Sequence, residues 1–167
     1  ATGYICSETL FGDKYPKQPY KSLIIVGGGP IGCEFSHIFA ATGTKVTVVQ
    51  HNNRLLSKAD EDISEQIRQN MEAFGIKTYL NANLLEAKKA DDQKTLLFED
   101  RETGERIEVT GEEIMYATGI KPVSKELKIE NTSIEMDERG WIKTNEFLET
   151  SVNGIWAIGD INGQPAF

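Results

Sequence analysis

Hydrophobic and polar positions alternate along the first half of the chain with two different periods. Three short segments have the length of buried strands, and the first two are apolar runs rich in β-branched residues. They cover residues 23–26, 46–49 and 76–80. Two stretches between them carry apolar residues at helical spacing. They cover residues 31–41 and roughly 60–74, with Ser57 or Asp60 as a candidate N-cap of the second. This order predicts a parallel sheet with right-handed helical crossovers.

A different pattern follows the third run. Short strand-like segments separated by polar turns predict an antiparallel three-stranded meander, which would replace a helix as the crossover to another core strand. The meander strands are expected at 84–88, 95–99 and 106–109, and the core strand at 113–116. Beyond Pro122 the pattern is irregular, with strand candidates at 140–143 and 154–158. Residues 4–20 have no periodic apolar face and are predicted to be a linker.

The junction of the first strand and the first helix is rich in glycine. Gly27, Gly29 and Gly32 occupy the three glycine positions of G-x-G-x-x-G. In such a motif the glycines permit a tight turn, close approach of backbone to a pyrophosphate, and close packing of helix on strand. Pro30 suits the first turn of a helix, whose N-terminus attracts anions. The pattern predicts an α/β fold with a Rossmann-like parallel sheet, flanking helices and a β-meander crossover. It favours a dinucleotide over another nucleotide, with expected contacts from Gly27, Gly28, Gly29, Pro30, Ile31 and Gly32.

The second strand ends at Gln50, where sites that select NAD usually carry Asp or Glu to bind the adenosine ribose. A neutral Gln can hydrogen-bond a ribose hydroxyl but does not repel a 2′-phosphate. His51, Arg54 and Lys58 follow and offer positive charge to such a phosphate, although ordinary surface charge explains Arg54 and Lys58 somewhat better. We expect Gln50, His51 and Arg54 to contact the cofactor. NAD and NADP both stay open, with NAD slightly favoured.

The composition of the chain limits the classes of molecule that it could bind. The 167 residues are 39% hydrophobic, and no apolar run approaches the ~20 residues that a membrane helix needs. The net charge of -8 argues against nucleic acid and anionic membranes as partners. The two cysteines, Cys6 and Cys33, show no metal-binding spacing, so no metal site is expected, and they fit a reducing, cytoplasmic setting. The first residue is not Met, and we expect a fragment.

Three motifs together carry a family resemblance. They are Val-Gly-Gly-Gly-Pro-Ile-Gly-Cys-Glu-Phe at 26–35, Ala-Thr-Gly-Ile-Lys-Pro at 117–122 and Gly-Ile-Trp-Ala-Ile-Gly-Asp at 154–160. In this order and spacing the chain resembles the NAD(P)-binding domain of the pyridine nucleotide–disulfide oxidoreductases, flavoproteins with two dinucleotide-binding domains. Within them it most resembles dihydrolipoamide dehydrogenases, which pass a hydride between NAD(H) and FAD coupled to a redox disulfide.

The resemblance implies a division of the chain and roles for further residues. Residues 1–20 would link from the FAD domain, 21–143 would bind NAD(P), and 144–167 would return toward the FAD domain. It further implies roles for these residues: Glu34 facing the flavin and nicotinamide in catalysis, Ala117, Thr118 and Gly119 at the nicotinamide dinucleotide, and Asp160 at FAD. The alternative to a catalytic role is a structural one, in which Glu34 is an acid in the first turn of the helix and complements the helix dipole.

The implied partners are the rest of an FAD-dependent enzyme and, at full length, a second copy in a homodimer. Two enzyme alternatives stay open. One is a soluble pyridine nucleotide transhydrogenase, since these enzymes resemble the chain at Arg54-Leu55-Leu56, and the other is another disulfide reductase. An alternative of a different class is an isolated cofactor-binding module without turnover.

Overall fold

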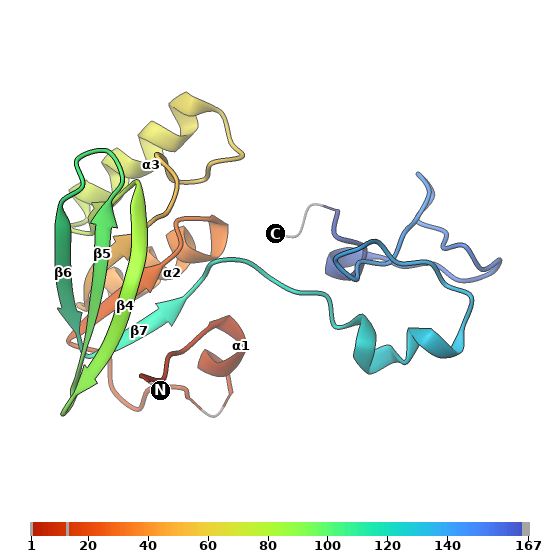
Figure 1. The fold of residues 1–167 in the computed structure, drawn as a ribbon, viewed down its shortest axis with the longest axis horizontal. Coiled ribbons are helices and arrows are strands. Elements are labelled where there is room, and N and C mark those ends of the chain that lie inside the picture. Colours follow the sequence, from red (N-terminus) through yellow and green to blue (C-terminus); the bar gives the residue numbers. More distant parts are fainter. Residues whose placement is uncertain (1, 13, 165–167) are drawn as a thin grey trace. The chain divides into compact units, whose positions relative to one another are not determined.

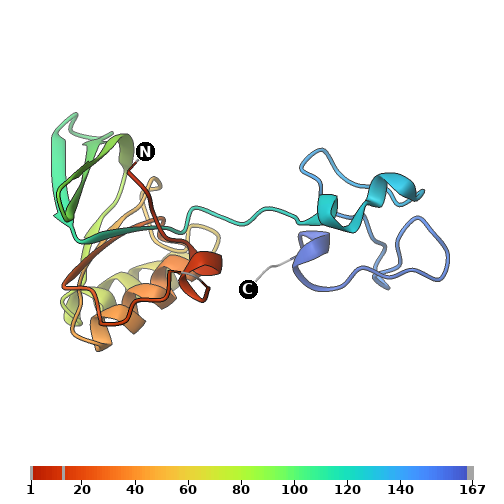
Figure 2. The same cartoon turned by 90° about the horizontal axis from the view of Figure 1, so that it is seen from below.

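A computed structural model describes residues 2–12 and 14–164. The chain forms two compact units, Ala1–Gly119 and Ile120–Phe167, and each is described by itself. The ribbon is drawn from two directions in Figures 1 and 2. The assignment of 21–143 to NAD(P) binding and of 144–167 to a return segment stays a prediction.

A four-stranded parallel sheet organises the first unit. Its strands are β1 (Ser22–Val26), β2 (Lys45–Val49), β3 (Lys77–Tyr79) and β7 (Glu113–Tyr116), in the order β3-β2-β1-β7. Every pairing in this sheet is parallel. The predicted parallel sheet is therefore confirmed, with each strand within two residues of its expected bounds.

Side chains of β1 alternate between two cores because successive residues of a strand point to opposite faces. Leu23 and Ile25 join the core beneath helices α2 (Pro30–Ala41) and α3 (Glu61–Ala73). Ile24 and Val26 join a second core on the other face. The predicted helices are confirmed, and α3 begins after Asp60, which occupies the N-cap position but makes no side-chain capping hydrogen bond.

The second face of the sheet is covered by the predicted antiparallel meander, which is confirmed. Its strands are β4 (Ala82–Ala90), β5 (Gln93–Asp100) and β6 (Arg106–Gly111). Leu96 and Phe98 of β5 are buried against the sheet. Figures 1 and 2 show the meander strands (green) and the two helices (orange and yellow) on opposite sides of the parallel strands.

The segment 4–20 differs from the predicted linker, because part of it is packed into the first unit. Ile5 forms a parallel bridge with Met115 of β7 and is only 1% exposed. Helix α1 (Ser7–Leu10) follows and buries Leu10. Two isolated apolar side chains produce no periodicity, which is why the pattern did not predict this packing. Whether the segment also connects to another domain stays a prediction.

The second unit has little regular structure. Its elements are three short 3-10 helices, η1 (Ser124–Leu127), η2 (Ile129–Asn131) and η3 (Gly159–Asn162). The strand candidates at 140–143 and 154–158 are wrong as strands, because each contributes only one residue to an isolated bridge, Ile142 and Trp156. The core of this unit is small and consists of Ile129, Ile142 and Ala157, with Ile134 and Ile161 against it.

Candidate nucleotide-binding site

Two glycines of the motif, Gly27 in the loop after β1 and Gly32 in α2, are required by the protein's own packing. Gly27 has φ +112°, and a Cβ there would overlap the carbonyl of Ala117. A Cβ on Gly32 would overlap the carbonyl oxygen of Gly27. These two positions therefore need glycine for backbone conformation and for close approach of helix to strand.

Gly29 is different, because nothing in the described protein requires a glycine there. Its φ of -77° and ψ of -175° are extended backbone that any residue adopts. A Cβ at Gly29 would meet no heavy atom within 4 Å, so it would project into open space. All fifteen glycines lie in the described ranges, and Gly29 alone combines an ordinary φ with open space. A ligand approaching the backbone would account for this glycine, as a side chain would occupy the ligand's space.

The N-terminus of α2 lies at the same point. Gly29 is the N-cap and provides no side-chain cap, while Pro30 occupies the first turn. The first turn of a helix leaves backbone N–H groups without intrahelical acceptors, and the helix dipole adds partial positive charge. The open space at Gly29 and these donors together fit an anionic group such as a pyrophosphate.

Gln50 holds this loop to the segment after β2. Its side-chain oxygen accepts a hydrogen bond from the Gly28 backbone N–H at 2.9 Å, and its side-chain nitrogen donates to the Arg54 carbonyl at 3.2 Å. The carbonyl of Gly28 accepts from the Leu56 N–H at 2.8 Å. Gln50 is 7% exposed. Both ends of its amide are thus engaged within the protein, and its predicted contact with ribose stays a prediction.

The segment 117–119 lies beside the glycine loop. The Ala117 N–H donates to the Val26 carbonyl at 2.8 Å, which continues the β1–β7 pairing. Gly119 has φ +142°, a conformation that favours glycine. The loops after β1, β2 and β7 therefore gather at the carboxyl ends of the parallel strands. There the chain crosses from β1 to β2 on one side, while β7, which is reached from β3 through the meander, pairs with β1 on the other side. Ligands of open α/β sheets bind at such a point.

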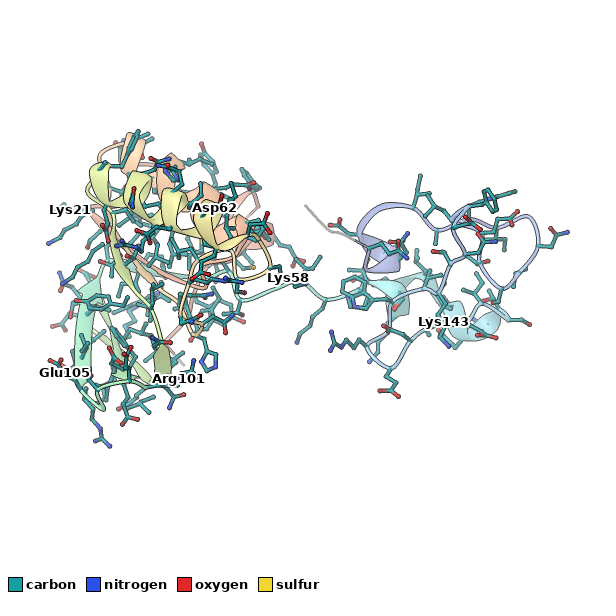
Figure 3. The ribbon with its side chains drawn as sticks, turned by 90° about the horizontal axis from the view of Figure 1, so that it is seen from above. Lys21, Lys58, Asp62, Arg101, Glu105 and Lys143 are labelled. Carbon is teal, nitrogen blue, oxygen red and sulfur yellow. The ribbon has the colours of Figure 1, made fainter. Side chains whose placement is uncertain are left out.

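A cavity of about 1200 Å³ adjoins the end of β2. Arg54, one of the predicted cofactor contacts, lines this cavity, whereas His51 and Lys58 are exposed and outside its lining. The contact of Arg54 with the cofactor stays a prediction. Arg101, on the turn after β5, also lines it, together with Asn81. Figure 3 labels Arg101 and Lys58. The sequence pattern did not single out Arg101, because its contacts lie 20 and 50 positions away in the chain.

The remaining candidate residues lie as follows. Glu34 is exposed and belongs to the second turn of α2, so its interpretation as a first-turn acid is wrong. Asp160 is exposed in η3 of the second unit.

Cys33 is buried in α2, and this burial, with the nearby charge of Glu34, raises the pKa of its thiol to about 11. No cluster of three metal-ligating side chains occurs within residues 2–12 and 14–164. No helix of the same ranges is long and apolar enough to cross a membrane.

Comparison with known proteins gives consistent matches. The sequence profile of the pyridine nucleotide-disulphide oxidoreductase family matches residues 7–167. A dihydrolipoyl dehydrogenase of Acholeplasma laidlawii is 39% identical over 157 residues, which are 94% of this chain and 43% of that protein. The dihydrolipoyl dehydrogenase of Geobacillus stearothermophilus is 33% identical, over 87% of this chain and 31% of its own length.

Solved structures agree with these sequence matches. The HOCl-induced flavoprotein disulfide reductase RclA from Escherichia coli, in its Cu(II) complex, superposes with a TM-score of 0.83 at 30% identity. The match covers 99% of this chain and 35% of that one. The chain thus spans between about a third and two-fifths of the length of these relatives.

Proposed function

The chain belongs to the pyridine nucleotide-disulphide oxidoreductase family, and from that premise we propose that it carries the nicotinamide-dinucleotide site of an FAD-dependent oxidoreductase. The activity proposed for the whole protein is that of a dihydrolipoamide dehydrogenase, with hydride transfer between NAD(H) and FAD coupled to a redox disulfide. The single observation that supports the binding site best is Gly29, whose Cβ position is open and whose backbone conformation needs no glycine.

This chain's part in that chemistry is to bind and orient the nicotinamide dinucleotide, while the two cofactors supply the hydride chemistry. The first-turn N–H groups of α2 would hold the pyrophosphate at Gly29. Ala117, Thr118 and Gly119 would lie along the nicotinamide half, and Gln50 and Arg54 along the adenosine half. Glu34 would face the reacting rings, and Asp160 would contribute to the FAD site of the whole enzyme. The rest of that enzyme, and a second copy of it, are the proposed partners.

The test is titration calorimetry of NADH and NADPH with the 167-residue chain, without added FAD. We expect binding at submillimolar to millimolar concentration. Gly29→Val should abolish it while the fold survives, because Val accepts the extended backbone of Gly29 and its side chain would fill the pyrophosphate space.

The matched control is Ala73→Val, which places the same side chain on an exposed position at the end of α3 and should leave binding unchanged. Circular dichroism establishes that both variants are folded. Undiminished affinity of folded Gly29→Val would mean that the phosphates bind elsewhere, and no binding of either cofactor by the unchanged chain would refute the proposal.

A further inference from the structure

The turn between β5 and β6 is joined to the loop that follows β2. The Arg101 guanidinium donates from Nη2 to the His51 carbonyl at 2.6 Å. The Arg101 backbone N–H donates to the Asn81 carbonyl at 3.0 Å, and the Asn81 N–H donates to the Asn52 carbonyl at 3.0 Å. Three segments far apart in sequence are thus held together by backbone groups and one guanidinium.

This junction is continuous with the glycine loop. Gln50, whose amide holds Gly28 and Arg54, is followed directly by His51 and Asn52. Arg101 therefore contacts the same loop that carries Arg54, and both side chains line the cavity of about 1200 Å³. In the proposed function this loop lies along the adenosine half of the cofactor, so the cavity would receive the 2′ position of that ribose.

The charges around the cavity decide which substituent it accepts. Arg68 is neutralised by Glu65 and Glu72 on its own helix. Among the residues that the structure describes, neither Arg54 nor Arg101 has a carboxylate oxygen within 4.0 Å of its guanidinium. The hydrogen bonds of both guanidinium groups go to backbone carbonyls, of Ser57 for Arg54 and of His51 and Asn81 for Arg101.

Each of these two guanidinium groups has five N–H donors, so donors are left for an anion. An arginine fork matches the oxygens of a phosphate. The carboxylates of Glu61 and Asp62 also line the cavity and act against an anion. The preference for a phosphate is therefore expected to be shallow rather than exclusive.

We propose that Arg101 is a specificity-determining residue for the 2′ position of the adenosine ribose, and that the cavity it shares with Arg54 accepts a 2′-phosphate. This inference rests on the proposed function, because it needs a dinucleotide at the glycine loop. The inference goes beyond the proposed function because it assigns the choice between NADH and NADPH to a residue of the meander, outside the loop after β2.

The experiment measures dissociation constants of NADH and NADPH for the 167-residue chain and three variants. Arg101→Gln removes the charge but keeps a donor for the His51 carbonyl. Arg101→Lys keeps the charge. Arg106→Gln is the matched control, since Arg106 lies on the same hairpin with a 70% exposed side chain, lies outside the cavity lining, and its removal changes net charge equally.

We expect Arg101→Gln to weaken NADPH by roughly three- to tenfold and NADH by less than about twofold, the scale of an exposed charge-assisted contact. Arg101→Lys should retain most of the NADPH affinity, and Arg106→Gln should retain all of it. The difference between the two cofactors should shrink as sodium chloride is raised, because salt screens exposed charges.

The outcomes separate the two proposals. If the unchanged chain binds neither cofactor, the proposed function fails, and the inference fails with it. If it binds a cofactor and Arg101→Gln weakens NADH and NADPH equally, Arg101 has only a structural role in the loop. If the ratio stays unchanged in both Arg101 variants, or falls as far in Arg106→Gln, the 2′ position lies elsewhere and the inference is overturned.

Discussion

Gln50 combines a structural contact with the predicted contact to ribose, and a single substitution addresses both. In Gln50→Glu the carboxylate still accepts from the Gly28 N–H, but it faces the Arg54 carbonyl without a proton to donate. We expect lower stability, and a shift in favour of NADH over NADPH of roughly 1–3 kcal/mol, because the carboxylate repels a 2′-phosphate and accepts ribose hydroxyls. Urea unfolding measures the stability, and titration of both cofactors measures the shift.

The control for Gln50→Glu is Gln66→Glu, which adds the same charge on an exposed position of α3 outside the cavity lining. It should change neither stability nor the cofactor ratio appreciably. A loss of stability in Gln50→Glu without a change in the ratio would place residue 50 away from the ribose and leave it with the loop contacts alone.

The two cysteines are expected to differ in reactivity. Burial raises the pKa of the Cys33 thiol from 9.0 to about 11. Near pH 8 the thiolate fraction of Cys33 is therefore about 100-fold lower than that of a thiol with the ordinary pKa. The Thr9 hydroxyl hydrogen-bonds the Cys6 sulfur at 3.5 Å and lowers the pKa of that thiol. Iodoacetamide at pH 8 should therefore alkylate Cys6 and spare Cys33 in the folded chain, and both after unfolding in urea. Peptide mass spectrometry checks this, and equal labelling of both in the folded state would contradict it.

The meander is attached to the parallel sheet by a largely buried ion pair between Lys94 of β5 and Glu113 of β7, whose side chain is 17% exposed. Lys94 is 7% exposed and also donates to the Gly3 carbonyl at 3.1 Å. Lys94→Met keeps the volume but leaves the Glu113 carboxylate without its partner. We expect a loss of about 3 kcal/mol in the free energy of unfolding, the low end for a broken buried pair. Urea denaturation measures this loss.

Two further variants decide whether the unpaired charge is responsible. Lys94→Met combined with Glu113→Leu should recover most of the stability, since a buried ion pair replaced by apolar residues is often neutral. Lys88→Met removes a lysine of β4 whose pair with Glu86 is exposed, and should leave the urea midpoint unchanged. If the double variant is as unstable as Lys94→Met, the loss comes from packing instead.

Elements with a strong pattern were predictable from the sequence, and elements without one were not. The apolar runs of β1, β2 and β7 gave strands within one residue of their bounds, because buried strands of a parallel sheet are continuously apolar. The second unit is held by a few apolar side chains with no fixed period, so its strand candidates were wrong.

Some residues of the candidate site were likewise predictable from the sequence, and others were not. The glycine loop was predictable because local sequence determines a turn and a helix start. Arg101 was not, because its place at the cavity depends on how the meander packs beside β2 and β3, which no local pattern records. The paired hydrogen bonds of the Gln50 amide were also invisible in the sequence, since they depend on the loop that follows it.

At the scale of the whole molecule, the division after Gly119 indicates which part is needed for binding. Every residue proposed to contact the nicotinamide dinucleotide lies in the first unit, with both cores of the parallel sheet. The predicted domain extends instead to residue 143. Chains of residues 1–119, 1–143 and 1–167 distinguish these boundaries by titration with NADH and NADPH and by thermal unfolding.

We expect the 1–119 chain to fold and to bind both cofactors within about threefold of the 1–167 chain, a difference below 1 kcal/mol. The physical reason is that the second unit has its own small core of Ile129, Ile142 and Ala157, so its removal takes no core side chain from the sheet. Gly29→Val in the 1–119 chain is the control and should abolish binding there too. If 1–119 unfolds or binds tenfold more weakly while 1–143 equals 1–167, then residues 120–143 belong to the binding domain, and the sequence-based boundary at 143 is the correct one.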